Sequence, residues 1–305
     1  MSSSGAPARR SGEAAGEGPA APSDDLLRVL DGGVLWLTLN RPDAGNSLTP
    51  AMRDQLSCWL EDASGDPAVR CVVLTANGTK GFCTGADLRA TSRASVPAPA
   101  GVAPGATAGS SPAGPAGRVV GDAARMIRNG WQRLVAAVLD CEKPVVAGVN
   151  ATAAGGGMHL ALACDIVIAA EEARFIEVFV RRGIAPDAGG AYLLARLIGP
   201  QKAKELLFFG DDLNAVDAER IGLVNRVVAR AELQGTLAEV AGRLARGPTK
   251  AIGVAKLLVN RSLEVDRATS FWEEAVAQEM VTLTADASEG MLSFVERRPP
   301  EFNGR

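Results

Sequence analysis

The chain has few residues of several kinds, and each shortage excludes a class of protein. It contains one histidine and five cysteines in 305 residues, and the cysteines lack CxxC or Cys/His spacing, so neither a metal site nor a disulfide framework is expected. Runs of about 18 apolar residues, which a membrane span requires, do not occur. The N-terminus also lacks the apolar stretch of a secretion signal. We therefore expect a cytoplasmic protein with reduced thiols and no membrane partner.

The chain also lacks a large excess of positive or negative charge. The formal net charge is -3, which leaves no basic excess to neutralise phosphates. No GxxxxGK[ST] phosphate loop is present either. Nucleic acid is therefore not an expected partner, and neither a nucleotide nor a flavin cofactor is indicated.

Composition divides the chain into a tail, a core that contains an insertion, and a C-terminal region. Residues 1–23 are mainly Ala, Gly, Ser and Pro and are predicted to form a disordered tail, because they cannot bury enough apolar surface to offset the entropy of ordering. Residues 90–117 have the same character and are predicted to be a flexible insertion, either a lid or a neutral spacer. Residues 24–229 are expected to form an α/β core. Residues 230–305 show only helical patterns and are expected to form a helical C-terminal region.

Short strands and helices alternate within the predicted core. Asp31-Gly32-Gly33 supplies turn chemistry for a hairpin over residues 26–39. A helix is predicted to begin at Pro50 with Thr49 as its N-cap. Buried strands are predicted where runs are apolar on both faces, at residues 70–75, 144–149 and 165–170. Helical patterns occupy residues 120–140, 155–163 and 200–209.

Three consecutive glycines, Gly155 to Gly157, follow one predicted strand and open a predicted helix. Backbone N–H groups at such a helix start have no intrahelical partner and can bind an anion. A second glycine-containing turn, "GFCTGADL" at residues 81–88, can bring another N–H group to the same sheet edge. Two convergent donors would make an oxyanion hole. On spacing alone, tight packing of the helix on a strand explains the glycines equally well.

Four segments together resemble the crotonase (enoyl-CoA hydratase/isomerase) superfamily: "LNRPDAGNSL", "GFCTGADL", "VNATAAGGGMHLALACDIVIAAEEARF" and "GIAPDAGGAYLLARLIG". The resemblance extends from about Leu26 to the C-terminus. It implies a spiral of ββα units with a helical C-terminal region used in oligomerisation, giving a homotrimer or a dimer of trimers. It also implies an acyl-CoA substrate whose thioester is stabilised as an enolate, with no cofactor beyond the CoA of the substrate.

The same resemblance assigns residues to the site. The two backbone N–H donors of the oxyanion hole correspond to Ala86 and Gly156. Residues expected to bind the substrate and its CoA are Asp43, Ala44, Gly45, Gly85, Asp87, Arg89, Gly155 and Phe179.

The chain departs from the family's hydratases at both of their glutamate positions. His159 stands at the first and Phe179 at the second. Water addition needs one group to deprotonate water and another to protonate carbon, so the loss of both carboxylates disfavours hydration.

Asp187 in "APDAGG" stands where isomerase members carry a catalytic aspartate. Among these, the phenylacetate-pathway isomerase branch also pairs this Phe with the "PD" sequence. Phe179 is interpreted as an apolar wall that keeps water from the enolate, or simply as a packed side chain.

Three side chains can also be interpreted as structural rather than catalytic residues. Asp187 can be the N-cap of the helix that follows it. His159 can be a core residue, although the helix start favours a neutral ring, which can accept a proton or donate a hydrogen bond to the substrate or to Asp187. Glu177 is interpreted as a surface residue rather than a substitute base. Our hypothesis is that Asp187 moves a proton between the α and γ carbons while His159 polarises or shuttles.

The sequence therefore predicts an acyl-CoA enzyme that shifts the double bond of an enoyl-CoA. The first alternative is an enoyl-CoA hydratase in which His159 and Asp187 replace the usual glutamates. A second alternative, of another class, is a silent acyl-CoA-binding or scaffold protein.

Overall fold

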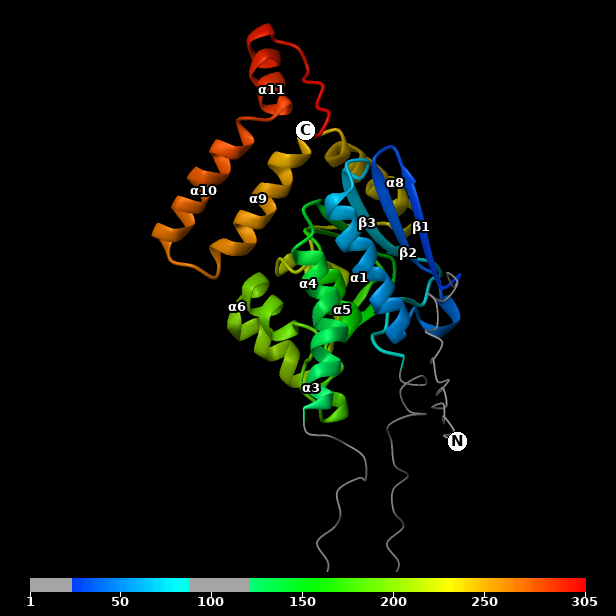
Figure 1. Cartoon of the computed structure of the whole chain (residues 1–305). Helices are drawn as coiled ribbons and strands as arrows, with labels where there is room; N and C mark the ends of the chain where they lie inside the picture. Colours follow the sequence, from blue (N-terminus) through cyan, green and yellow to red (C-terminus); the bar gives the residue numbers. More distant parts are fainter. Residues whose placement is uncertain (1–23, 88–120) are drawn as a thin grey trace, which may run out of the picture.

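A six-stranded sheet forms the centre of the computed structural model, which describes residues 24–87 and 121–305 (Figure 1). The predicted hairpin is present, with β1 (Leu26–Asp31) antiparallel to β2 (Val34–Leu39). From β2 onward the sheet is parallel, in the order β1-β2-β3-β5-β7-β10. The remaining strands are β3 (Cys71–Ala76), β5 (Val145–Val149), β7 (Ile166–Ala170) and β10 (Arg226–Val228). The predicted tail 1–23, the insertion 90–117 and Arg89 lie outside the described residues.

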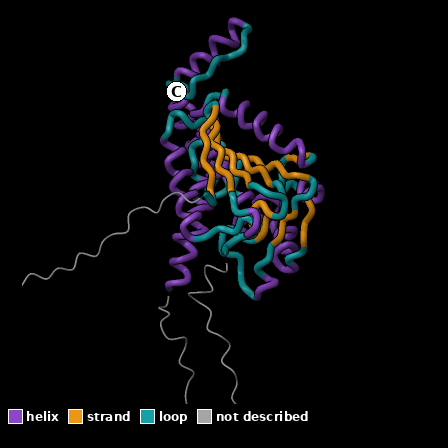
Figure 2. The backbone as a smooth tube through the Cα atoms, turned by 90° about the vertical axis from the view of Figure 1, so that its right-hand side faces the viewer, coloured by secondary structure: helices purple, strands orange, loops and turns teal. Residues whose placement is uncertain are grey.

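A second sheet of short strands accompanies the first and has the order β4-β6-β8-β9. Its strands are β4 (Gly81–Cys83), β6 (Thr152–Ala154), β8 (Arg174–Ile176) and β9 (Asp212–Asn214). Each central strand of the large sheet is followed in sequence by a strand of the small one, giving β3–β4, β5–β6 and β7–β8. This repetition is the predicted spiral, and Figure 2 shows the two layers of strands with helices around them.

Helices cover both faces of this framework. In α1 (Pro50–Gly65), the side chain of Thr49 caps the N–H of Met52 as predicted. The other helices before residue 230 are α3 (Asp122–Ile127), α4 (Arg133–Leu139), α5 (Gly156–Leu162), α6 (Gly190–Phe209) and α7 (Ala215–Arg220). A π-helical turn, Arg128–Gln132, joins α3 to α4, and α6 is kinked at Gly199, before Pro200.

The C-terminal helices divide into two groups. The first helix, α8 (Arg230–Ala245), lies against the large sheet, where Leu237 packs among Val73, Val146 and Ile168. Next, α9 (Thr249–Ser262) packs on the core, where the buried Lys256 donates hydrogen bonds to the carbonyls of Val138 and Lys143. The last two helices, α10 (Arg267–Val281) and α11 (Ala285–Glu296), project to one side of the core (Figure 1).

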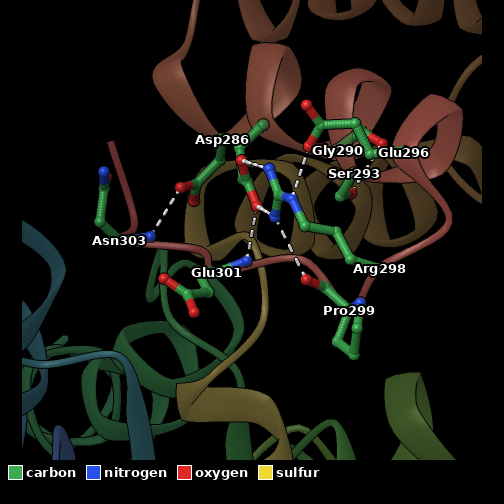
Figure 3. Close-up of polar contacts among 9 residues, drawn as sticks. Asp286, Gly290, Ser293, Glu296, Arg298, Pro299, Glu301 and Asn303 are labelled. Atoms are coloured by element: carbon green, nitrogen blue, oxygen red, sulfur yellow. Dashed lines mark hydrogen bonds and ion pairs between the residues drawn. The ribbon is translucent and has the colours of Figure 1, made fainter.

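The last residues fold back along α11 (Figure 3). The carboxylate of Asp286 accepts hydrogen bonds from the N–H groups of Asn303 and Gly304, at 2.7 and 2.8 Å. Glu289 forms an ion pair with Arg298, and this pairing lowers the pKa of Glu289 to about 2. The tail is thus fixed to α11 by charge-assisted hydrogen bonds.

Large apolar side chains lie exposed on these projecting helices. Trp272 on α10 is 70% exposed and Phe294 on α11 is 84% exposed, and Phe271, Met280 and Val295 are exposed as well. None of the helices in the described part of the chain is long and apolar enough to cross a membrane.

Candidate active site

Two backbone N–H groups are brought together by the small sheet. Strands β4 and β6 pair in parallel, so the turn after β4 and the glycine run after β6 lie at the same edge. Gly85 adopts a φ of +92°, and a Cβ placed on it would lie 3.6 Å from the backbone nitrogen of Gly156. Ala86 and Gly156 are therefore neighbours in space although they are 70 positions apart in the sequence.

The surrounding hydrogen bonds single out these two amides. Asp87 donates its N–H to Leu48, and Leu48 donates to the carbonyl of Gly85. Gly155 donates to the carbonyl of Ile176. Within the described residues, the N–H groups of Ala86 and Gly156 are left without a hydrogen-bond acceptor. The pattern leaves two adjacent donors in the arrangement that an oxyanion hole requires.

The glycine run also has a packing function. A Cβ on Gly157 would lie 2.1 Å from the carbonyl oxygen of Cys83, and one on Gly156 would lie 2.9 Å from the Trp131 ring. The packing interpretation of these glycines is therefore confirmed, and the same close packing brings the Gly156 amide to the edge of β4.

The predicted CoA-binding segment lies against the same turn. Residues Pro42–Ala44 form a 3-10 helix that ends at Gly45, whose carbonyl accepts the N–H of Thr84 at 3.1 Å. Asp87 pairs with Arg41 at 2.9 Å. The structure thus brings Asp43, Ala44 and Gly45 together with Gly85, Ala86 and Asp87.

His159 is fully buried and is hydrogen-bonded to a second buried side chain. Its Nε2 lies 2.8 Å from Oε1 of Glu177, and the two residues are 0% and 2% exposed. The prediction that Glu177 lies on the surface was therefore wrong. The chain after β8 turns inward, so Glu177 meets the imidazole instead of solvent.

Two further residues enclose the imidazole. The ring of Phe179 is stacked on it with centroids 5.3 Å apart, and Phe179 is itself buried. Gly190, at the start of α6, leaves space for Nε2, since a Cβ there would lie only 2.1 Å from that atom. Both interpretations of Phe179, as a wall and as a packed side chain, agree with this position.

Asp187 is half-buried in the segment before α6. Burial raises the pKa of its carboxyl group, while the proximity of His159, a hydrogen bond from its own backbone and the charge of Arg53 act in the opposite direction. The N-cap of α6 is Gly189, so the alternative interpretation of Asp187 as the cap was wrong. Its carboxylate is therefore not used by the helix.

Arg53 also lies in this region, and its place there was not predicted from the sequence. It is 8% exposed on α1, its guanidinium lies 5.4 Å from the centre of the Trp131 ring, and its Nε has no hydrogen-bond partner within the described residues. Burial lowers its pKa, whereas Asp54 and Asp187 raise it. Arg53 directly follows the core residue Met52 in a helix that otherwise exposes its charged residues, and no sequence signal marks its burial.

The arrangement can stabilise negative charge on a ligand oxygen and move a proton beside it. The donors are two amides that need no side chain, and the titratable groups near them are Asp187, His159 and Glu177. Within residues 24–87 and 121–305, no three His, Cys, Asp or Glu side chains gather as a metal-binding group.

Comparison with known proteins agrees with this geometry. A family model described as enoyl-CoA hydratase/isomerase matches residues 30–103 and 116–305. A probable enoyl-CoA hydratase of Rhodobacter capsulatus is 34% identical over 273 residues, which cover 90% of this chain and 95% of the relative. The 1,2-epoxyphenylacetyl-CoA isomerase of Escherichia coli is 34% identical over 280 residues, with coverages of 92% and 98%.

A solved structure shows the same fold. The crystal structure of an enoyl-CoA hydratase from Bacillus anthracis superposes with a TM-score of 0.80 at 31% identity, covering 92% of this chain and all of that chain. The chain therefore belongs to the enoyl-CoA hydratase/isomerase family of the crotonase superfamily and is an enzyme of CoA-thioester chemistry.

Proposed function

We propose that the enzyme shifts the double bond of an enoyl-CoA through a thioester enolate. The observation that carries the proposal is the pairing of β4 with β6, which leaves the N–H groups of Ala86 and Gly156 adjacent and without acceptors among residues 24–87 and 121–305. Removal of a proton from the α carbon moves charge onto the thioester oxygen, and donors already in place stabilise that charge. No cofactor beyond the CoA of the substrate is needed for this step.

Asp187 is the proposed proton carrier. Its carboxylate takes the proton from the α carbon of a 3-enoyl-CoA, and the electron pair of that C–H bond becomes part of a conjugated dienolate. The same carboxyl group returns a proton to the γ carbon, which yields the 2-enoyl-CoA with no net gain or loss of atoms. A partly buried carboxyl group with a raised pKa suits a group that must both accept and donate.

Isomerisation is favoured over hydration by Phe179. At the position of the second hydratase glutamate, this chain presents an aromatic ring that is buried against His159. Such a ring has no group that can orient water for attack on the β carbon.

Hydration is the second candidate, because one observation favours it. The Glu177–His159 pair places a carboxylate and an imidazole together behind the glycine run, and such a pair can serve as a base. Both activities also occur in the names of relatives. The relative from Rhodobacter capsulatus is named a probable hydratase, and the relative from Escherichia coli is named an isomerase.

The products formed in D2O distinguish the two reactions. The purified enzyme is given a 3-enoyl-CoA in D2O, and the products are followed by NMR. Isomerisation predicts that 2-enoyl-CoA carrying deuterium accumulates without a 3-hydroxyacyl product. Conversion onward to 3-hydroxyacyl-CoA would favour hydration, and the absence of both exchange and product would contradict the proposed function.

We further propose that the enzyme works as a homotrimer or a dimer of trimers. The support is the exposed apolar surface of α10 and α11, which includes Phe271, Trp272 and Phe294. Apolar surface of this extent on projecting helices is typical of subunit interfaces.

A further inference from the structure

Asp187 differs in burial from His159 and Glu177. Asp187 is half-buried, whereas His159 and Glu177 are 0% and 2% exposed. Asp187 lies three residues before Gly190, whose backbone lies against the imidazole of His159, and His159 and Glu177 share a hydrogen bond of 2.8 Å. The imidazole therefore contacts both the segment that follows the proposed proton carrier and a buried carboxylate.

The hydrogen bond to Glu177 indicates which ring nitrogen of His159 carries the proton when the carboxylate is ionised. An ionised carboxylate has only acceptor atoms, so in a 2.8 Å contact with it the proton belongs on Nε2. The other ring nitrogen, Nδ1, is buried and has no hydrogen-bond partner within the described residues, and the same holds for Oε2 of Glu177. A buried polar atom left without a partner is costly, and such atoms occur where a ligand, an ordered water or a reacting group completes the bond.

Packing prevents the ring from exchanging its two nitrogens. Phe179 covers one face of the imidazole, with ring planes inclined by 12°. The backbone of Gly190 lies so close to Nε2 that no Cβ would fit between them. Rotation of the ring would break the bond to Glu177 and leave a buried carboxylate unpaired.

We propose that Glu177 is a positioning residue that holds His159 in the Nε2–H tautomer, so that Nδ1 accepts and returns the proton moved by Asp187. The inference rests on the proposed function for the identity of the proton. In the balanced step, the proton that Asp187 has taken from the α carbon passes to the lone pair of Nδ1. Glu177 stabilises the resulting imidazolium, and the proton returns through Asp187 to the γ carbon.

The single histidine of the chain makes the tautomer directly measurable. Protein labelled with ¹⁵N-histidine and purified without a histidine tag gives one imidazole in a long-range ¹H–¹⁵N correlation spectrum. At neutral pH we expect one species with the proton on Nε2 and a lone pair on Nδ1. A proton on Nδ1 with an unprotonated Nε2 would overturn the proposal, and this measurement needs no substitution.

A double-mutant cycle tests whether Glu177 acts through His159. Glu177→Gln keeps the shape of the side chain, and we expect it to mix the tautomers and to slow α-proton exchange about 10- to 100-fold, as for other partners that orient a histidine. In a His159→Gln background the same change should have no further effect. Equal losses in both backgrounds would contradict the proposal. Glu171→Gln, at an exposed glutamate just after β7, is the control.

Failure of the inference can be separated from failure of the proposed function. The tautomer is read without substrate, so the expected spectrum together with an enzyme that exchanges no α proton would overturn the proposed function alone. Isomerisation by the wild-type enzyme with His159 protonated on Nδ1 would overturn the role of Glu177 alone.

Discussion

The ring of Phe179 lies stacked on the imidazole of His159, with centroids 5.3 Å apart and ring planes within 12° of parallel. The family resemblance assigns these two residues to the positions at which hydratases carry their glutamates. Instead of two carboxylates facing a water molecule, the chain has two stacked rings and a carboxylate, Glu177, behind them. The contact explains why proton transfer without water addition is the reaction that we propose.

Removal of the charge of Arg53 is expected to shift the pH dependence of turnover. Burial raises the pKa of Asp187, and Arg53 partly offsets this effect. In Arg53→Met the pKa of Asp187 should therefore rise further, and the acidic limb of kcat/KM should move to higher pH, because a base works only when ionised. Arg53→Lys keeps the charge and should leave the limb near its wild-type position. Identical limbs in wild type and Arg53→Met would contradict the coupling.

A methyl group at position 156 is expected to disturb the oxyanion site without unfolding the protein. In Gly156→Ala, the new Cβ would lie 2.9 Å from the Trp131 ring, so the ring or the helix start must shift. We expect α-proton exchange to fall at least about tenfold, since a displaced donor stabilises the enolate less well.

The matched control for this change is Gly235→Ala, at an open and exposed position of α8. It should leave activity unchanged and raise stability slightly, because alanine is the better helix former. Equal activities of the two variants, with both folded by circular dichroism, would show that the Gly156 amide does not hold the thioester oxygen.

Subunit assembly should depend on the apolar residues of the projecting helices. Light scattering after gel filtration is expected to give three or six times the mass of one chain. Trp272→Glu places a charge on a side chain that is 70% exposed in one chain and should lower that mass, because burying an unpaired charge in an interface is unfavourable. Gln234→Glu on the exposed side of α8 should not change it. A monomeric wild-type protein would contradict the assembly.

The five cysteines should differ strongly in reactivity. Burial raises the pKa of the Cys71 and Cys83 thiols to about 12, and it also raises the pKa of Cys164. Because the thiolate is the reactive form, native protein should be alkylated first at half-buried Cys58. Mass spectrometry of peptides after a short exposure to iodoacetamide checks this order, and denatured protein should react at all five. Early modification of Cys83 would mean that the strand beside the glycine run is open.

The large elements of the fold could be predicted because each has a strong local signal. The strands at 71–76, 145–149 and 166–170 are runs of apolar, often β-branched residues, and Asp31-Gly32-Gly33 has the chemistry of the turn it forms. Strands β4, β6, β8 and β9 have three residues each, which is too short for a periodic pattern. Their pairing was therefore not predicted. The glycine-containing turns suggested that two N–H groups meet at one sheet edge, and the family resemblance assigned these groups to Ala86 and Gly156.

The candidate site was predictable only where a motif marks it. The motifs located Ala86, Gly156, His159 and Asp187. Glu177 was assigned to the surface because glutamates are usually solvated, but a buried imidazole 18 positions away supplies its partner. Arg53 lacks any such motif, and its burial depends on the π-helical turn that places Trp131 beside it.

The most direct test of the account is the rate at which Asp187→Asn exchanges the α proton of a 3-enoyl-CoA in D2O. Asparagine keeps the size of the side chain but cannot accept the proton. If Asp187 carries the proton, exchange and isomerisation should fall together by about 10²- to 10⁴-fold, the contribution typical of a general base, with substrate binding retained. An Asp187→Asn enzyme that exchanges and isomerises within a few fold of wild type would contradict the account.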